Sequence, residues 1–404
     1  MHPRQQWLLV GAASLILLVL MGSRQSQGLF VSPINSTTGI GIVPISLAIA
    51  LGHLFWGLIQ PAAGWIADKY GAGRVLVFGI LTYALGMALT ATVRDAPALI
   101  FTLGFMAATG AGAASFSVLL GAVGRRISVE KRGLAAGVIN AGSSLGQFIF
   151  APITQSSIDF FGWHIALIGV GVVACCVLPL VYVLRDNPSS LGVATTREHS
   201  PSLKFLLIDA FSNKSYIYLH LGFMTCGFHI AFLSTHLPGE VALCGQSANV
   251  ASWSLGIVGL ANVLGSLTFG WLTQKFRSKY LLFAMYFSRA VLILLYLIAP
   301  KTEITFYLFS VGLGFTWLAT VAPTATIVSK LFGTRFLATL FGLTLVSHQL
   351  GGFLGAYSGG VAMNIQGTYQ WIWIIDASLA LLAALICLPI QEPQIDRKTS
   401  SKPR

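Results

Sequence analysis

The sequence contains little charge. Aspartate, glutamate, lysine and arginine make up 9% of the 404 residues, against roughly a quarter in an average soluble protein. Hydrophobic residues make up 55%, and the mean hydropathy is +0.79. So few charged side chains do not cover a surface that faces water, which excludes an ordinary soluble domain. The composition instead indicates an integral membrane protein.

Motifs for catalysis and for metal binding are also missing. The five cysteines do not have the spacing of metal ligands. No nucleophile elbow, metal-binding helix or nucleotide loop occurs in a plausible context. We therefore expect no enzyme, no catalytic residue, no metal and no cofactor. A basic membrane face against anionic lipid accounts for the net charge of +12, so nucleic acid is not expected as a partner.

Apolar stretches long enough to span a bilayer, about 20 residues each, occur along the whole chain. The first stretch has no small-residue cleavage site of a signal peptide, so we expect it to remain in the protein. The twelve stretches are 7–32, 43–66, 74–93, 97–124, 132–158, 164–184, 215–238, 250–273, 280–299, 303–330, 336–361 and 369–390. They predict an all-α membrane protein with twelve transmembrane helices.

Basic residues indicate the orientation, because lysine and arginine accumulate in cytoplasmic loops. With the N-terminus inside, Arg94 and Lys301 lie in outer loops, and Arg24 and Arg289 lie within helices. Every other basic residue then falls on the cytoplasmic side. We expect both termini in the cytoplasm, and the inner membrane of a bacterium as the location.

The chain divides into two halves of six helices. GWIADKYGAGRV at Gly64 recurs as GWLTQKFRSKYL at Gly270, and GVINAGSSLGQF at Gly137 aligns with GLTLVSHQLGGF at Gly342. We expect bundles at 1–184 and 215–390, a central cytoplasmic loop at 185–214 and a tail at 391–404. Transporters that bind substrate between two repeated halves have this layout.

The segment GWIADKYGAGRV resembles a signature motif of the major facilitator superfamily, with Gly64, Asp68, Gly71 and Arg74 at the motif's positions. The resemblance implies that superfamily's fold of two pseudo-symmetric six-helix bundles. It also implies close helix approach at Gly64 and charge contacts of Asp68 that latch the cytoplasmic side. The second copy has Gln274 at the place of Asp68, so we expect such a latch in one half only.

Residues 124–167 are similar to helices 4–6 of the monocarboxylate carriers and oxalate/formate antiporters, with His164 where that branch usually has arginine. The resemblance implies one cation in helix 1 and another in helix 8 or helix 11. Arg24 fits the first position. Asn262 and Ser266 occupy the helix 8 positions that face the cavity.

Acidic residues are nearly absent from the predicted membrane core, where Asp376 alone lies, near the outer end of the last helix. Arg24 and Arg289 therefore outnumber the carboxylates, and an arginine inside a membrane is costly unless it is paired or functional. An anionic substrate is the natural partner. Arg24 either lines a wet cavity or snorkels to the outer interface, and Arg289 is either a substrate ligand or an internal strut.

Other polar side chains lie on predicted helices beside these arginines. His348 is either a third cationic ligand or a satisfied core histidine; His229 is the most central histidine of helix 7, and His53 in helix 2 is a weaker candidate. The helix 5 polar residues suit hydrogen bonding to a small carboxylate. The predicted substrate ligands are Arg24, Arg289, His348, Gln349, Asn140, Ser144, Gln147, His229 and Asn262.

Together these features predict a monomeric secondary transporter of a small, monocarboxylate-like organic anion, working by alternating access. Both proton symport and anion exchange are consistent with the sequence. Proton coupling would use a histidine, whose usual pKa is about 6.5, or the carboxyl group of the substrate. The alternative is an exporter of drugs or other neutral or cationic molecules, although cation exporters usually need a carboxylate in the membrane.

Overall fold

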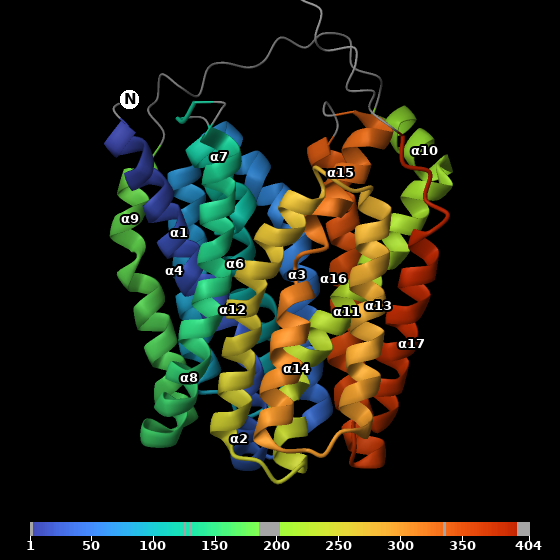
Figure 1. Ribbon diagram of the computed structural model, residues 1–404. Coiled ribbons are helices and arrows are strands. Elements are labelled where there is room, and N and C mark those ends of the chain that lie inside the picture. The colour runs from blue at the N-terminus through green and yellow to red at the C-terminus, as the bar shows by residue number, and fades with distance from the viewer. Residues whose placement is uncertain (1–2, 125, 129–130, 186–202, 334–336, 394–404) are drawn as a thin grey trace, which may run out of the picture.

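The computed structural model describes residues 3–124, 126–128, 131–185, 203–333 and 337–393, and every regular element in that part of the chain is a helix (Figure 1). The first half contains α1 (Pro3–Gln25), η1 (Gln27–Phe30), α2 (Val31–Thr38), α3 (Ile42–Tyr70), α4 (Ala72–Thr90), α5 (Ala96–Leu99), η2 (Ile100–Ala107), α6 (Ala108–Ala113), α7 (Phe116–Gly124), α8 (Arg132–Cys176) and α9 (Leu178–Val183). The second half contains α10 (Leu203–Ser212), α11 (Lys214–Leu243), α12 (Ala248–Leu272), α13 (Ser278–Ile298), α14 (Glu303–Thr316), α15 (Val321–Phe332), α16 (Leu337–Gln366) and α17 (Gln370–Cys387).

Ten helical segments within the described residues are long and apolar enough to cross a membrane. One of them, Arg132–Val183, has 52 residues and would be about 78 Å long if straight, against a bilayer core of about 30 Å. Gly162 divides it into two crossings with a φ of 78°, a conformation that favours glycine. Helix α16 adds a further crossing of 30 residues. The predicted twelve-helix architecture is therefore confirmed.

Two crossings differ from the predicted stretches. The first runs from Gln5 to Thr38, beyond the predicted end at residue 32, because the hydroxyls of Ser36, Thr37 and Thr38 bond to carbonyls of the preceding helical turn. The tenth is interrupted after Thr316, where α14 ends, and α15 begins at Val321, with four residues between the two helices.

Helix α10 occupies the last third of the predicted central loop at 185–214. Residues 186–202 of that loop and residues 394–404 of the predicted tail lie outside the described residues. The boundaries of the two bundles therefore remain expectations from the sequence.

Each half encloses an apolar core. One cluster of buried side chains extends through α1 to α9, and two others fill the second half. Figure 1 shows the first half in blue to green on one side and the second half in yellow to red on the other. Helices α3 and α16, and α8 and α12, form the main contacts between the halves.

Glycines reproduce the sequence repeat in the packing of the two halves. Gly22 and Gly146 bring the backbones of α1 and α8 into contact, and Gly227 and Gly351 do the same for α11 and α16. Each residue of the second pair follows its counterpart by 205 residues, which is the offset between Gly137 and Gly342. Small residues at such crossings permit close van der Waals packing of membrane helices, so the two halves are built on the same plan.

The two ends of the molecule differ in how closely the halves approach each other. We call the end with the start of α1 and the end of α3 the terminal face, at the top of Figure 1, and the other end the opposite face. Near the opposite face, Gly28 packs on the backbone of Ser234 in the other half, and a Cβ on Gly256 would lie 3.2 Å from the Phe148 carbonyl oxygen. The halves therefore meet at the opposite face.

Near the terminal face, glycines of four helices make no close contact. A Cβ added to Gly64 of α3, Gly137 of α8, Gly270 of α12 or Gly342 of α16 would meet no atom within 4 Å. The glycines of these helices thus mark a close approach of the halves at the opposite face and none at the terminal face.

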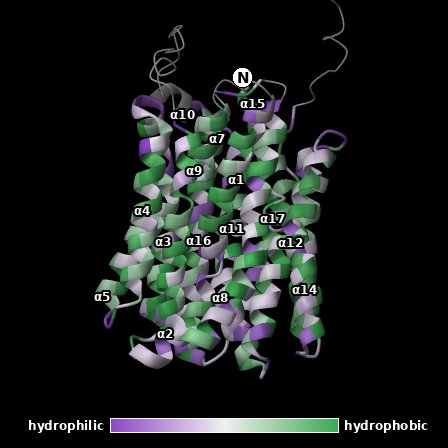
Figure 2. Cartoon of the chain, turned by 90° about the vertical axis from the view of Figure 1, so that its left-hand side faces the viewer, coloured by the Kyte–Doolittle hydropathy of each residue, from purple (hydrophilic) through white to green (hydrophobic). Residues whose placement is uncertain are grey.

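The outer surface is suited to lipid. Large apolar side chains such as Phe160 and Ile298, each 82% exposed, lie on it. Figure 2 shows hydrophobic residues along the helices and hydrophilic residues concentrated towards the two ends. Exposed apolar surface of this extent is stable in a bilayer and unstable in water.

We predict that Gly146→Ala destabilises the protein and that Gly137→Ala, on the same helix, does not. Both changes gain helix propensity, about 1 kcal/mol, but a Cβ at residue 146 overlaps the Leu18 carbonyl oxygen of α1. Overpacking of this kind costs about 1–3 kcal/mol. Thermal unfolding in detergent measures the difference. Equal midpoints for the two variants would contradict the packing described here.

Candidate functional site

Arg24 lies deep within the first crossing. It is the penultimate residue of α1, and the crossing continues through η1 and α2 for another fourteen residues to Thr38. At 1.5 Å per residue, its Cα is about 20 Å from that end of the helix. The side chain is half-buried. Because this distance exceeds the reach of an arginine, snorkelling to the outer interface does not explain its position.

Arg24 is held loosely by α3. Its Nη2 lies 3.5 Å from the Gly52 carbonyl oxygen and 3.4 Å from His53 Nδ1, at the long end of hydrogen-bond distances. Its guanidinium carbon lies 4.7 Å from the ring centroid of Trp56. The described residues place no carboxylate within ion-pair distance. The guanidinium therefore retains donors for a further partner.

The second half contributes His348 and Gln349 of α16 to the same place. Gln349 packs against Gly57 of α3, and a Cβ on Gly352 would lie 3.3 Å from the His53 ring. Gln349 Nε2 donates to His348 Nδ1 over 3.2 Å. Through these contacts, the part of α3 that holds Arg24 packs against α16.

Several polar atoms in this group are buried without a partner: Trp56 Nε1, His348 Nε2 and Gln349 Oε1. Buried polar groups are almost always hydrogen-bonded, so three such atoms in one place call for water or a ligand. We call Arg24, His53, Trp56, His348 and Gln349 the Arg24 cluster. It combines one guanidinium with unsatisfied donors and acceptors, at the contact between the halves.

Polar residues of α8 form a second group. Asn262 Nδ2 of α12 donates to Ser144 Oγ over 2.7 Å, a hydrogen bond that joins the two halves. Gln147 is fully buried, with both amide atoms unpartnered. Gln25, next to Arg24, reaches Ser143 Oγ at 3.3 Å. Asn140 is half-buried on the same helix, towards the terminal face.

Arg289 is 1% exposed and contacts protein groups throughout. Its Nε donates to Thr316 Oγ1 over 3.2 Å, its Nη1 lies 3.2 Å from Cys226 Sγ, and its Nη2 donates to the carbonyls of Thr316 and Trp317. These carbonyls lie at the interruption between α14 and α15, which leaves them without helical partners. Asn262 accepts from the Leu318 amide over 2.9 Å at the same interruption. Arg289 and Asn262 thus fix the broken helix.

His229 lies apart from Arg24, inside the second half. Its Nδ1 is 2.6 Å from Asp376 Oδ2, the two side chains are 2% and 1% exposed, and its ring centroid is 6.0 Å from that of Trp317. His229 follows Arg24 by 205 residues, the offset of the repeat. The structure therefore places it at the equivalent position of the second half, in a buried pair.

Residues of the signature motif lie at the terminal face. Gly71 ends α3 with a φ of 95°, which explains the need for glycine there. Gly64 faces open space in this conformation, and the side chains of Asp68 and Arg74 are exposed. The close approach and the charged latch implied by the motif remain predictions.

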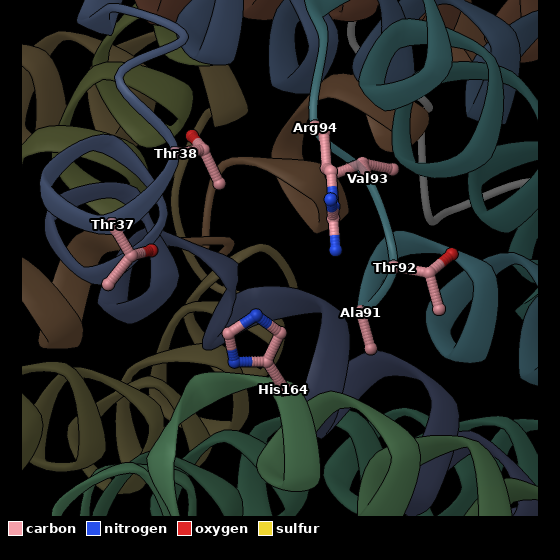
Figure 3. A pocket seen from close by; sticks show the side chains of 7 residues that line it. All are labelled: Thr37, Thr38, Ala91, Thr92, Val93, Arg94 and His164. Atoms are coloured by element: carbon pink, nitrogen blue, oxygen red, sulfur yellow. The ribbon is translucent and has the colours of Figure 1, made fainter.

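A separate polar pocket of about 460 Å³ opens in the first half near the opposite face. Figure 3 shows Arg94 directed into it above His164. Its lining residues are Thr37, Thr38, Ala91, Thr92, Val93, Arg94 and His164. Because all of them belong to one half, relative movement of the halves does not open or close this pocket.

From the sequence, His53 was a weaker candidate for the site, and Trp56 was not predicted. Both side chains lie on one face of α3, three residues apart, and they contact Arg24 together. The signal available in the sequence was the i, i+3, i+4 spacing of His53, Trp56 and Gly57, which places them on one side of a helix.

Two repeated six-helix halves in a membrane, with a charged polar cluster where they meet, define a transport protein rather than an enzyme. The model of the Major Facilitator Superfamily matches residues 13–243 and 241–404. The chain belongs to this superfamily, as the signature motif implied.

Relatives and solved structures agree with this assignment. The chain is 23% identical to monocarboxylate transporter 13 of Bos taurus, over 95% of this chain and 89% of that protein. It is also 23% identical to the oxalate:formate antiporter of Oxalobacter formigenes, over 95% and 92% of the two chains. The crystal structure of a D-xylose-proton symporter matches with a TM-score of 0.77 at 14% identity, over 96% of this chain and 98% of that one. The last match concerns the fold alone.

We predict that Arg289→Gln lowers thermal stability much more than Arg24→Gln. Removal of the Arg289 guanidinium leaves the buried Thr316 carbonyl without a donor, at about 1–3 kcal/mol, and leaves the Trp317 carbonyl only the weak Cys226 thiol at 3.9 Å. Arg24, by contrast, makes long, partly solvated contacts. Unfolding midpoints of the two purified variants test this. A larger loss for Arg24→Gln would contradict the assignment of Arg289 as a strut.

Proposed function

We propose that this protein is a secondary transporter of a small organic anion and that Arg24 binds the anion. The observation that supports this most directly is a guanidinium without a carboxylate partner, surrounded by unsatisfied polar atoms where the halves meet. A carboxylate supplies the acceptors that an arginine fork prefers. His348 and Gln349, from the other half, complete the proposed site.

The proposed substrate is a monocarboxylate. Arg24 contributes one positive charge, and the half-buried Trp56, whose ring centroid lies 4.7 Å from the guanidinium carbon, provides apolar surface for a short carbon skeleton. The relatives named as a monocarboxylate transporter and an oxalate:formate antiporter support this class. Ser144, Gln147 and Asn140 lie along α8 where the substrate would pass.

We further propose that the terminal face is cytoplasmic, in the inner membrane of a bacterium, with both termini inside. Basic residues such as Lys69, Arg74 and Lys330 lie at this face, as the positive-inside rule requires. The structure then represents a state open to the cytoplasm. Transport proceeds as residues 1–184 and 215–390 rock about the cluster, within a monomer, until the opposite face opens.

An exporter of cationic molecules is less well supported. The buried carboxylates of the described residues are already engaged: Asp376 with His229, Glu392 with Lys330, and Glu240 with the Tyr296 hydroxyl. None belongs to the Arg24 cluster. A cationic substrate would therefore meet Arg24 without a compensating negative charge. Electrostatics thus favours an anion at this site.

We predict that Arg24→Gln abolishes uptake of the transported monocarboxylate and that Arg24→Lys weakens it, because lysine keeps the charge but loses the bidentate geometry. Substrates are first found by thermal shift of the purified protein with lactate, pyruvate, oxalate, formate and dicarboxylates. Uptake into liposomes then compares the variants. Arg94→Gln, in the pocket of Figure 3, is the matched control and keeps normal uptake. Normal uptake by Arg24→Gln would disprove the assigned role.

A further inference from the structure

The contact between Arg24 and His53 defines the protonation state of this histidine. Arg24 Nη2 lies 3.4 Å from His53 Nδ1, and a guanidinium has donors but no acceptor. His53 Nδ1 must therefore present its lone pair, with the ring proton on Nε2. In the anion-free state His53 is neutral and acts as a weak acceptor for Arg24.

His348 is neutral in this state by the same reasoning. The amide Nε2 of Gln349 donates to His348 Nδ1 over 3.2 Å, which requires a lone pair on that nitrogen. The Arg24 cluster thus carries a single positive charge, on Arg24, when no anion is bound.

A bound carboxylate changes what His53 contacts. Its two oxygens accept hydrogen bonds from Arg24 better than a histidine nitrogen does, because charge-assisted pairs are shorter and stronger. His53 Nδ1 then loses its donor and faces a negatively charged group. A proton taken up on Nδ1 makes His53 a cationic donor to the same carboxylate.

Charge balance favours this protonation. The empty cluster carries one positive charge. With a monoanion on Arg24 and a proton on His53, the total is again one positive charge, so both forms carry the same charge through the membrane as the halves move. Each cycle moves one anion and one proton, with no net charge.

The described surroundings of His53 supply no carboxylate that would compete for the proton. The charged or titratable groups that act on it are Arg24 from α1 and His348 from α16. On the other side of α3, the neighbouring Gly52 packs against Gly104 of η2 and Ala108 of α6. No carboxylate of the described residues acts on His53.

Access to water supports a role in proton release. His53 and Arg24 are both half-buried, unlike the fully buried His229–Asp376 pair, and Gly64 of α3 and Gly342 of α16, nearer the terminal face, would carry a Cβ without meeting any atom within 4 Å. A proton that leaves His53 in this conformation leaves on the same side as the anion, and Arg24 then regains its contact with Nδ1.

We propose that His53 is the proton-binding residue that couples one proton to each monocarboxylate, which makes the protein an electroneutral symporter. The inference rests on the proposed function of Arg24 as the anion-binding residue. It assigns to His53 of α3 the coupled proton, in addition to a contact with the carboxylate that Arg24 binds.

The test uses purified full-length protein in liposomes with radiolabelled pyruvate. Two activities are measured: accumulation driven by a pH gradient, and exchange of internal for external pyruvate at equal pH. We expect His53→Gln to lose at least tenfold in gradient-driven accumulation. Exchange should continue at saturating pyruvate but with a higher half-saturating concentration, because the variant lacks the cationic donor that His53 offers to the carboxylate. His164→Gln, which removes an exposed histidine of the separate pocket, should retain both activities.

The possible results separate this inference from the proposed function. Two results would overturn the coupling role of His53: accumulation that persists in His53→Gln, or exchange that this variant loses together with accumulation. Neither result would contradict the proposal that the wild-type protein transports an anion. A wild-type protein that neither exchanges nor accumulates pyruvate would overturn both. Exchange retained by His53→Gln also shows that this variant is folded.

Discussion

A guanidinium without a counter-ion, placed where the two halves meet, is the constraint on which the rest of the site depends. Charge inside a membrane protein is costly unless other groups replace its hydration. Arg24 obtains a carbonyl and a histidine nitrogen from α3 at the long end of hydrogen-bond distances, and the aromatic face of Trp56 at 4.7 Å. These contacts keep the charge in place without neutralising it. An anion is the partner that improves on them, and both halves contact the place where it would bind.

The two membrane arginines differ in what their guanidinium groups contact. Arg289 is enclosed and uses its donors on the carbonyls at the break between α14 and α15, which Asn262 also holds through the Leu318 amide. Asn262 in turn bonds to Ser144 of the first half. The broken helix is thereby linked to the surface where the halves meet. The equivalent positions of the two halves also differ in their surroundings. Arg24 lies where the halves meet, whereas its counterpart His229 is buried against Asp376.

The sequence was sufficient for the architecture and for part of the site. Twelve apolar stretches, the duplicated motif and the excess of arginine over membrane carboxylates predicted the fold and selected Arg24. The partners of these residues were not predictable, since they depend on which helix faces come together. Hydropathy ended the first helix at residue 32, because hydroxyls that bond back to the helix look like a loop. The pairing of His229 with Asp376 joins residues 147 apart, and no local pattern encodes it.

The accessibility of the two guanidinium groups tests the central claim most directly. Phenylglyoxal modifies arginines that reach water, and peptide mass spectrometry locates the modified residues. The account predicts that Arg24 is modified in the purified protein, that bound substrate protects it, and that Arg289 stays unmodified in both conditions until the protein unfolds. Modification of Arg289 with protection by substrate, or an Arg24 that never reacts, would contradict the account.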